Sequence, residues 1–131
     1  MNNVELAKKW LTIAEEDFEM SIIAKEKNKA LYAAFHLQQS QEKVLKGIFV
    51  FHGLGQPPYL HDLSRLADAV KPVFPIEERF YVFFASLNPF YIRARYPDYK
   101  KFVEKSLDDS LLEDFQNTGK EVLSWLKLLC Q

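Results

Sequence analysis

The fold is decided by the stretch ALYAAFHLQQSQEKVLKGIFVFH, residues 30–52, which is followed by GLGQPP. At 100° per residue its large apolar side chains fall in one sector of a helix; these are Ala34, Leu37, Val44, Leu45, Ile48 and Phe51. Gly53 and Gly55, with two prolines after them, are typical of a helix end. The stretch therefore predicts one long core helix from about Ala30 to His52.

Polar residues on this helix make a second pattern. Gln41 interrupts the apolar sector, and because an unpaired buried amide costs roughly 1–3 kcal/mol, we expect Gln41 to be buried and hydrogen-bonded. Its partner should be a backbone carbonyl or a polar group on another helix. The opposite side of the helix carries a polar strip, consisting of His36, Gln39, Glu42, Lys43 and Lys46. This strip either faces water or lines a site. Within it, the i, i+4 spacing of Glu42 and Lys46 also suits a surface ion pair.

Amphipathic periodicity and capping residues predict further helices around this one. A long first helix begins after Asn2 or Asn3 and is closed by Asn28. Asp108 or Asp109 caps the last helix. Gly119 in that last helix should let another backbone approach closely. The expected ranges are Val4–Lys27, a short Leu60–Val70, Ile76–Leu87 and Ser110–Leu129, with FYIRARYPDYKK (residues 90–101) as a loop. The expected fold is all-α, an antiparallel up-and-down bundle of four long helices plus one short helix, in a single domain spanning residues 1–131.

Composition excludes several classes of protein. A single cysteine, Cys130, excludes a disulfide framework and Cys-rich zinc modules. The 17 basic and 18 acidic residues leave a net charge of −1, so no global basic field holds nucleic acid. The N-terminal charges are too frequent for a signal peptide or membrane span, which indicates a cytoplasmic protein without membrane contact. We expect no cofactor and no metal, since His52, His61 and Asp62 lack the i, i+4 spacing of helical metal ligands.

Aromatic and apolar side chains exceed the needs of a small core. Aromatic residues make up 15% of the chain and include 11 Phe. On the first helix, Trp10 together with Leu6, Ile13 and Met20 widens the apolar stripe beyond one neighbour. We therefore expect a homodimer with an isologous contact.

Basic and aromatic residues alternate between Tyr91 and Lys105. The segment has a net charge of +3, from Arg93, Arg95, Lys100, Lys101 and Lys105 against Asp98 and Glu104, with Tyr91, Tyr96 and Tyr99 between them. Arginine forks and aromatic faces bind phosphates and stack on bases. The alternative is a solvated turn whose arginines pair with acidic residues of neighbouring helices.

The histidines are the other candidates for chemistry. A pair from His36, His52 and His61 could act as general acid and base in RNA cleavage. Each also has a structural interpretation, because His52 lies at a helix C-terminus, His61 lies at a helix start, and His36 lies on the polar strip. The sequence contains no Gly-rich phosphate loop, nucleophile elbow or Cys-His pair, so we assign no catalytic residue.

Four stretches together resemble the HEPN family of small prokaryotic helical domains, namely WLTIAEEDFEMSIIA, AAFHLQQSQEKVLKGIFVFHG, HDLSRL and YIRARYPDY. The most specific parts are the Gln38–Lys46 run, the His61 helix start and Arg95-Tyr96-Pro97. The resemblance implies a dimeric bundle, often encoded with a minimal nucleotidyltransferase as a toxin and antitoxin pair, and a role in binding nucleotide or RNA.

Many HEPN ribonucleases carry an arginine followed four to six residues later by a histidine. Here every histidine lies at or before position 61 and every arginine after it, so that motif is absent. The resemblance therefore implies a binding role for Lys46, His61, Arg95 and Tyr96. Arg93 of the basic segment completes the expected ligand-binding residues. The alternative is a ribonuclease with a rearranged site that combines His36 or His61 with Arg93 or Arg95.

Overall fold

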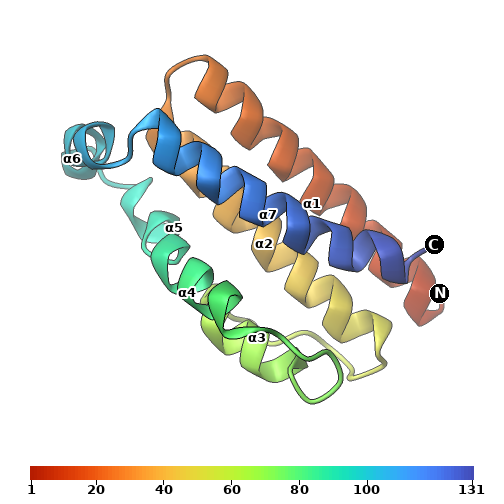
Figure 1. Cartoon of the computed structure of the whole chain (residues 1–131). Coiled ribbons are helices and arrows are strands. Elements are labelled where there is room, and N and C mark those ends of the chain that lie inside the picture. The colour runs from red at the N-terminus through yellow and green to blue at the C-terminus, as the bar shows by residue number, and fades with distance from the viewer.

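A computed structural model describes the backbone of residues 1–131 and all side chains except those of Tyr99, Lys100 and Glu104. This described part contains seven helices, α1 (Asn3–Glu26), α2 (Ala30–Phe51), α3 (Leu63–Val70), α4 (Glu78–Leu87), α5 (Phe90–Arg93), α6 (Asp98–Ser106) and α7 (Asp109–Leu129). The long helices α1, α2 and α7 lie side by side, and α3, α4 and α5 cover the remaining side of α2 (Figure 1). Successive segments α1, α2, α4 and α7 alternate in direction (Figure 1), so the predicted all-α antiparallel bundle is confirmed.

Local capping explains why α1 begins and ends, and why α7 begins, where the sequence predicted. The Asn2 side chain accepts a hydrogen bond from the Glu5 amide at 2.9 Å, and Asn28 closes α1 with a left-handed φ of 59°. At the start of α7, Asp108 accepts from the Leu111 amide at 2.8 Å. Asp62 caps α3 in the same way, so that helix starts at Leu63 rather than at Leu60.

The segment 90–101 is not the loop that the sequence indicated. Residues 90–93 form α5, and α6 begins at Asp98. Proline is compatible with the first turn of a helix, where no intrahelical amide donor is needed, and Pro89 and Pro97 each stand immediately before one of these helices. Only the short turn around Tyr96 is non-helical, as expected for the residue before a proline.

The centre of the bundle is α2, most of whose side chains are buried. Gln41 is fully buried, and its amide donates to the Gly119 carbonyl at 3.3 Å, which confirms the predicted pairing. Gly119 admits side chains rather than a second backbone, because a Cβ there would lie 2.7 Å from Leu37 Cδ1. None of the described helices has the length and apolar character needed to cross a membrane.

Candidate functional site

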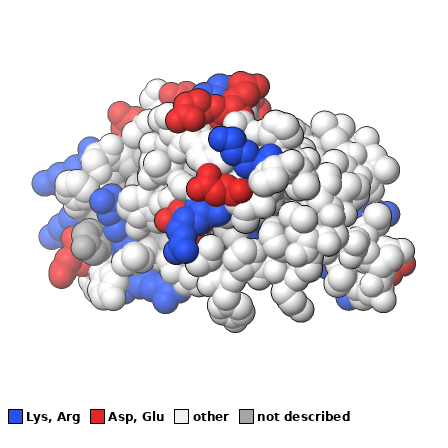
Figure 2. Space-filling view, turned by 90° about the horizontal axis from the view of Figure 1, so that it is seen from below, with Lys and Arg blue, Asp and Glu red and all other residues white. Residues whose placement is uncertain are grey.

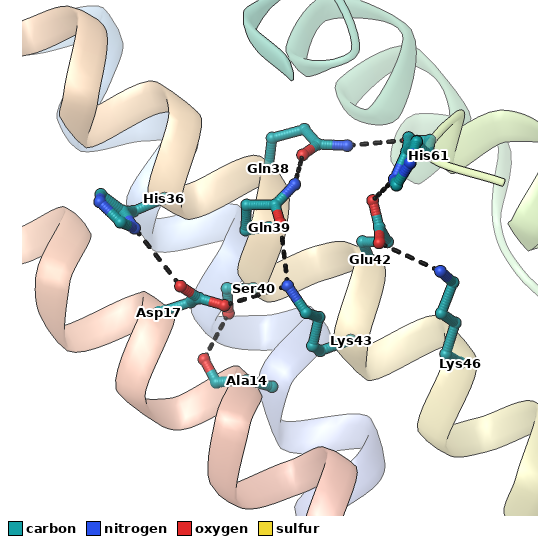
Figure 3. Close-up of polar contacts among 10 residues, drawn as sticks. All are labelled: Ala14, Asp17, His36, Gln38, Gln39, Ser40, Glu42, Lys43, Lys46 and His61. Carbon is teal, nitrogen blue, oxygen red and sulfur yellow. Dashed lines mark hydrogen bonds and ion pairs between the residues drawn. The ribbon is translucent and has the colours of Figure 1, made fainter. Parts of the chain in front are cut away.

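The polar strip of α2 is largely enclosed rather than facing water. Glu42 is 3% exposed and Lys46 is 9% exposed, so their 3.1 Å ion pair is buried and is not the surface pair that their spacing suggested. Burial arises because the chain after α2 turns back and places His61 over Glu42 (Figure 3). A carboxylate in this position must be fully paired, because an unpaired buried charge is strongly destabilising.

Glu42 joins two of the predicted site residues. One carboxylate oxygen accepts from the Lys46 ammonium at 3.1 Å, and the other lies 3.0 Å from Nδ1 of His61. The Gln38 side chain also donates to the His61 carbonyl at 2.8 Å, so α2 holds both the ring and the backbone of His61 (Figure 3). With Nδ1 bound to Glu42, the imidazole has Nε2 left for a ligand.

A stack of rings connects His61 to the basic segment. The Tyr91 ring of α5 lies 4.1 Å from the His61 ring at an interplanar angle of 16°. Arg95 donates to the Tyr91 hydroxyl at 2.8 Å, and its guanidinium carbon lies 4.6 Å from the centre of the Tyr91 ring. Glu42, His61, Tyr91 and Arg95 thus form a continuous chain of contacts from the core helix to the turn after α5.

Two of these residues were missed in the assignment from sequence. Glu42 was interpreted as half of a surface ion pair, and Tyr91 was noted only as one of several tyrosines among cations. The i, i+4 spacing of Tyr91 and Arg95 would have indicated their contact had residues 90–101 been interpreted as helical.

Three of the five predicted site residues line two open cavities. The first has a volume of about 410 Å³ and is lined by His61, Asp62, Asn88, Pro89, Tyr91 and Ile92. The second has a volume of about 590 Å³ and is lined by Arg93, Tyr96, Asp98 and Phe102. The structure therefore groups Lys46, His61 and Arg95 through shared partners, and places Arg93 and Tyr96 at a separate cavity.

The arginines of the basic segment contact aromatic rings. Arg95 contacts Tyr91, and the Arg93 guanidinium lies 5.7 Å from the Phe90 ring and 5.8 Å from the Phe102 ring. Lysines and arginines gather at the end of the molecule that contains α6, at the left in Figure 2. Three residues counted in this segment, Tyr99, Lys100 and Glu104, lie outside the described side chains.

The remaining histidines lie elsewhere. His36 Nδ1 is 3.3 Å from an Asp17 oxygen, and the other Asp17 oxygen accepts from Lys43 at 3.4 Å, so His36 is at the opposite end of the polar network from His61 (Figure 3). His52 caps α2, and its Nε2 is buried without a hydrogen-bond partner among the described residues. Within the described part of the chain, no three His, Cys, Asp or Glu side chains are grouped to hold a metal ion.

Comparison with known proteins identifies the family. The chain shares its fold with a solved structure described as TT1696 from Thermus thermophilus, with a TM-score of 0.81 and 21% identity, over 98% of this chain and 99% of that one. No curated protein matches the sequence. The model of the HEPN domain matches residues 7–129, nearly the whole chain. On this match, the protein belongs to the HEPN domain family.

Proposed function

We propose that the protein binds a nucleotide or RNA, with Arg95 as the main phosphate contact and with Lys46, His61, Arg93 and Tyr96 in the site. The observation that carries this proposal is the stack of His61, Tyr91 and Arg95 beside an open cavity. Such a stack combines two elements of nucleotide recognition, namely an aromatic surface beside the cavity for a base and a planar cation for a phosphate.

Arg95, His61 and Lys46 have distinct roles in this proposal. The Arg95 guanidinium carries five N–H donors, and its bond to Tyr91 orients the fork while leaving donors for phosphate oxygens. His61 presents Nε2 because Glu42 holds Nδ1. Lys46 is too enclosed to be the main phosphate contact, so its role is to neutralise the Glu42 carboxylate, which would otherwise repel a phosphate.

The proposal is tested by calorimetric titration with ATP, GTP and short RNAs. Arg95→Ala should weaken binding by about 1.5–3 kcal/mol, the value of a hydrogen bond to a charged group, which is roughly 10- to 150-fold in Kd. Arg95→Lys keeps the charge but loses the fork and should restore binding only in part. Lys127→Ala, which removes one exposed cation from α7, serves as the control.

Normal binding by Arg95→Ala would contradict this assignment. If that variant also melted at a much lower temperature, Arg95 would be a structural residue that orders the turn after α5.

We also propose that the protein acts as a homodimer through α1. Leu6, Ile13 and Met20 are 38%, 43% and 46% exposed, and their spacing of seven residues places them along one line of the helix. In an antiparallel isologous pair centred on Ile13, Leu6 lies opposite Met20 of the second copy. The same register places Lys9 opposite Asp17 of the second copy and next to Glu16, so charges of opposite sign flank the apolar line.

Sedimentation measures this contact. The wild type should have twice the 15.4 kDa mass of one chain, and Ile13→Glu should be a folded monomer, because a charge on the two-fold axis would face its own copy. Leu128→Glu, at an exposed position of α7, should remain dimeric. A wild-type monomer at micromolar concentration would refute the dimer.

Membership of the HEPN family supports a further proposal about partners, that the chain forms a toxin and antitoxin pair with a nucleotidyltransferase. A nucleotidyltransferase reading frame next to this one, and a stable complex of the two purified proteins, are the expected findings. A chromosomal neighbourhood without such a frame would argue against the pairing.

A second candidate function, ribonuclease, is favoured by one observation. Glu42 holds Nδ1 of His61 and leaves Nε2 beside the cavity. Arg95 is linked to His61 through the Tyr91 ring. An oriented general base and a phosphate-binding cation are thus connected by one ring. His36 has an analogous carboxylate partner, Asp17, but lies at the other end of the polar network. RNA cleavage that disappears in His61→Ala would establish this activity, and intact RNA on a gel would exclude it for the substrates tried.

A further inference from the structure

Arg93 and Tyr96 line a second cavity, which is distinct from the cavity beside His61 and Tyr91. It is the cavity of about 590 Å³ between the turn after α5 and α6. Two of its lining rings are accessible, since Tyr96 is 54% exposed and Phe102 is 57% exposed. The Arg93 guanidinium lies 5.8 Å from the Phe102 ring, so a cation stands beside an accessible aromatic face.

The two cavities adjoin. Ile92 lines the first and Arg93 lines the second, and these are consecutive residues of α5, whose Cα atoms are therefore about 3.8 Å apart. Arg95 contacts Tyr91 of the first cavity and is followed in the chain by Tyr96 of the second. The linings of the two cavities are therefore neighbours along residues 91–96 of the chain.

The lining of the second cavity favours a base over a phosphate. Asp98 lines it and would repel a phosphate, but its carboxylate accepts hydrogen bonds from the exocyclic amine of a base. Phe102 and Tyr96 offer rings on which a base can stack, and the surrounding segment, with a net charge of +3 over residues 90–106, attracts the linking phosphates.

We propose that the Arg93–Phe102 cavity is a second nucleobase subsite, so that the protein holds two successive nucleotides of a single strand. This inference rests on the proposed function, because the first nucleotide occupies the cavity beside His61 and Tyr91. Phe102 stacks on the second base, Arg93 supports that ring and faces the connecting phosphate, and Asp98 contacts the edge of the base.

The experiment compares AMP, the RNA dinucleotide ApA carrying a 5′-phosphate like that of AMP, and a four-residue oligoadenylate by calorimetric titration. ApA should bind at least about fivefold more tightly than AMP, the low end of what one stacked base contributes. Phe102→Ala should remove this advantage and leave AMP binding unchanged. Phe102→Trp, which keeps a stacking face, should retain the advantage, and so should Leu128→Ala, which truncates an exposed apolar residue of α7.

The outcomes separate this inference from the proposal on which it rests. Equal affinity of the wild type for AMP and ApA, or an undiminished ApA advantage in Phe102→Ala, would overturn the second subsite. If AMP binding still depended on Arg95 in that case, the first site would stand. Failure of all three ligands to bind would refute both proposals together. Circular dichroism on Phe102→Ala confirms that the measured protein is folded.

Discussion

Removal of the Glu42 carboxylate is the sharpest test of the site's architecture. Glu42 is 3% exposed and neutralises Lys46 at 3.1 Å while binding His61 at 3.0 Å. In Glu42→Ala the Lys46 ammonium loses its counter-charge in an enclosed position. At an effective dielectric constant of about 20, the lost attraction at this distance is about 5 kcal/mol before any relaxation.

Relaxation reduces this loss. The Lys46 stem can move its ammonium toward water, so we expect the free energy of unfolding to fall by about 3 kcal/mol, the low end for breaking a buried pair. For a domain of this size that corresponds to a Tm lower by roughly 12 °C. Replacing both charges, in Glu42→Leu with Lys46→Leu, should recover most of the loss, because the pair then leaves no uncompensated charge.

Differential scanning calorimetry measures these shifts, and the protein contains its own control. Arg79 and Glu121 form a pair of nearly the same length, 3.0 Å, but both side chains are more than half exposed. Glu121→Ala should therefore leave Tm almost unchanged. If Glu42→Ala and Glu121→Ala gave the same small shift, burial would not control the strength of the Glu42 contacts, and our account of the site would be wrong.

Two further predictions concern the core and the surface. Gly119→Ala places a Cβ 2.7 Å from Leu37 Cδ1, so overpacking should outweigh the higher helix propensity of alanine. Urea denaturation should show an unfolding free energy lower by about 1 kcal/mol. An unchanged or raised stability would show that Leu37 moves aside freely. Burial, together with the hydrogen bond to Asp68, raises the pKa of Tyr81 from 10.0 to about 12. The folded state then holds the Tyr81 proton more tightly than the unfolded state, so the contribution of Tyr81 to stability is complete below pH 10 and falls as pH rises toward 12. Tyr81→Phe should therefore lose less stability at alkaline pH than the wild type. Identical slopes of stability against pH would contradict the raised pKa.

The features that can be predicted from the sequence involve residues close together along the chain. Both ends of α1 and the start of α7 follow from Asn2, Asn28 and Asp108, each of which acts on residues only a few positions away. The burial of Gln41 followed from its position in the apolar sector of one helix. Periodicity and capping are local, and so they can be predicted without knowing how the helices pack.

The site depends on how distant segments of the chain pack together. Glu42 and His61 are separated by the whole turn after α2, and His61 meets Tyr91 only because α5 packs against α2. Whether a polar strip faces water or lines a site depends on which distant segment covers it, and the sequence alone left both alternatives open. The same holds for Arg93 and Arg95, which the sequence placed in one basic segment. In the fold Arg93 lines the cavity beside α6, whereas Arg95 contacts Tyr91, because residues two positions apart in a helical turn point in different directions.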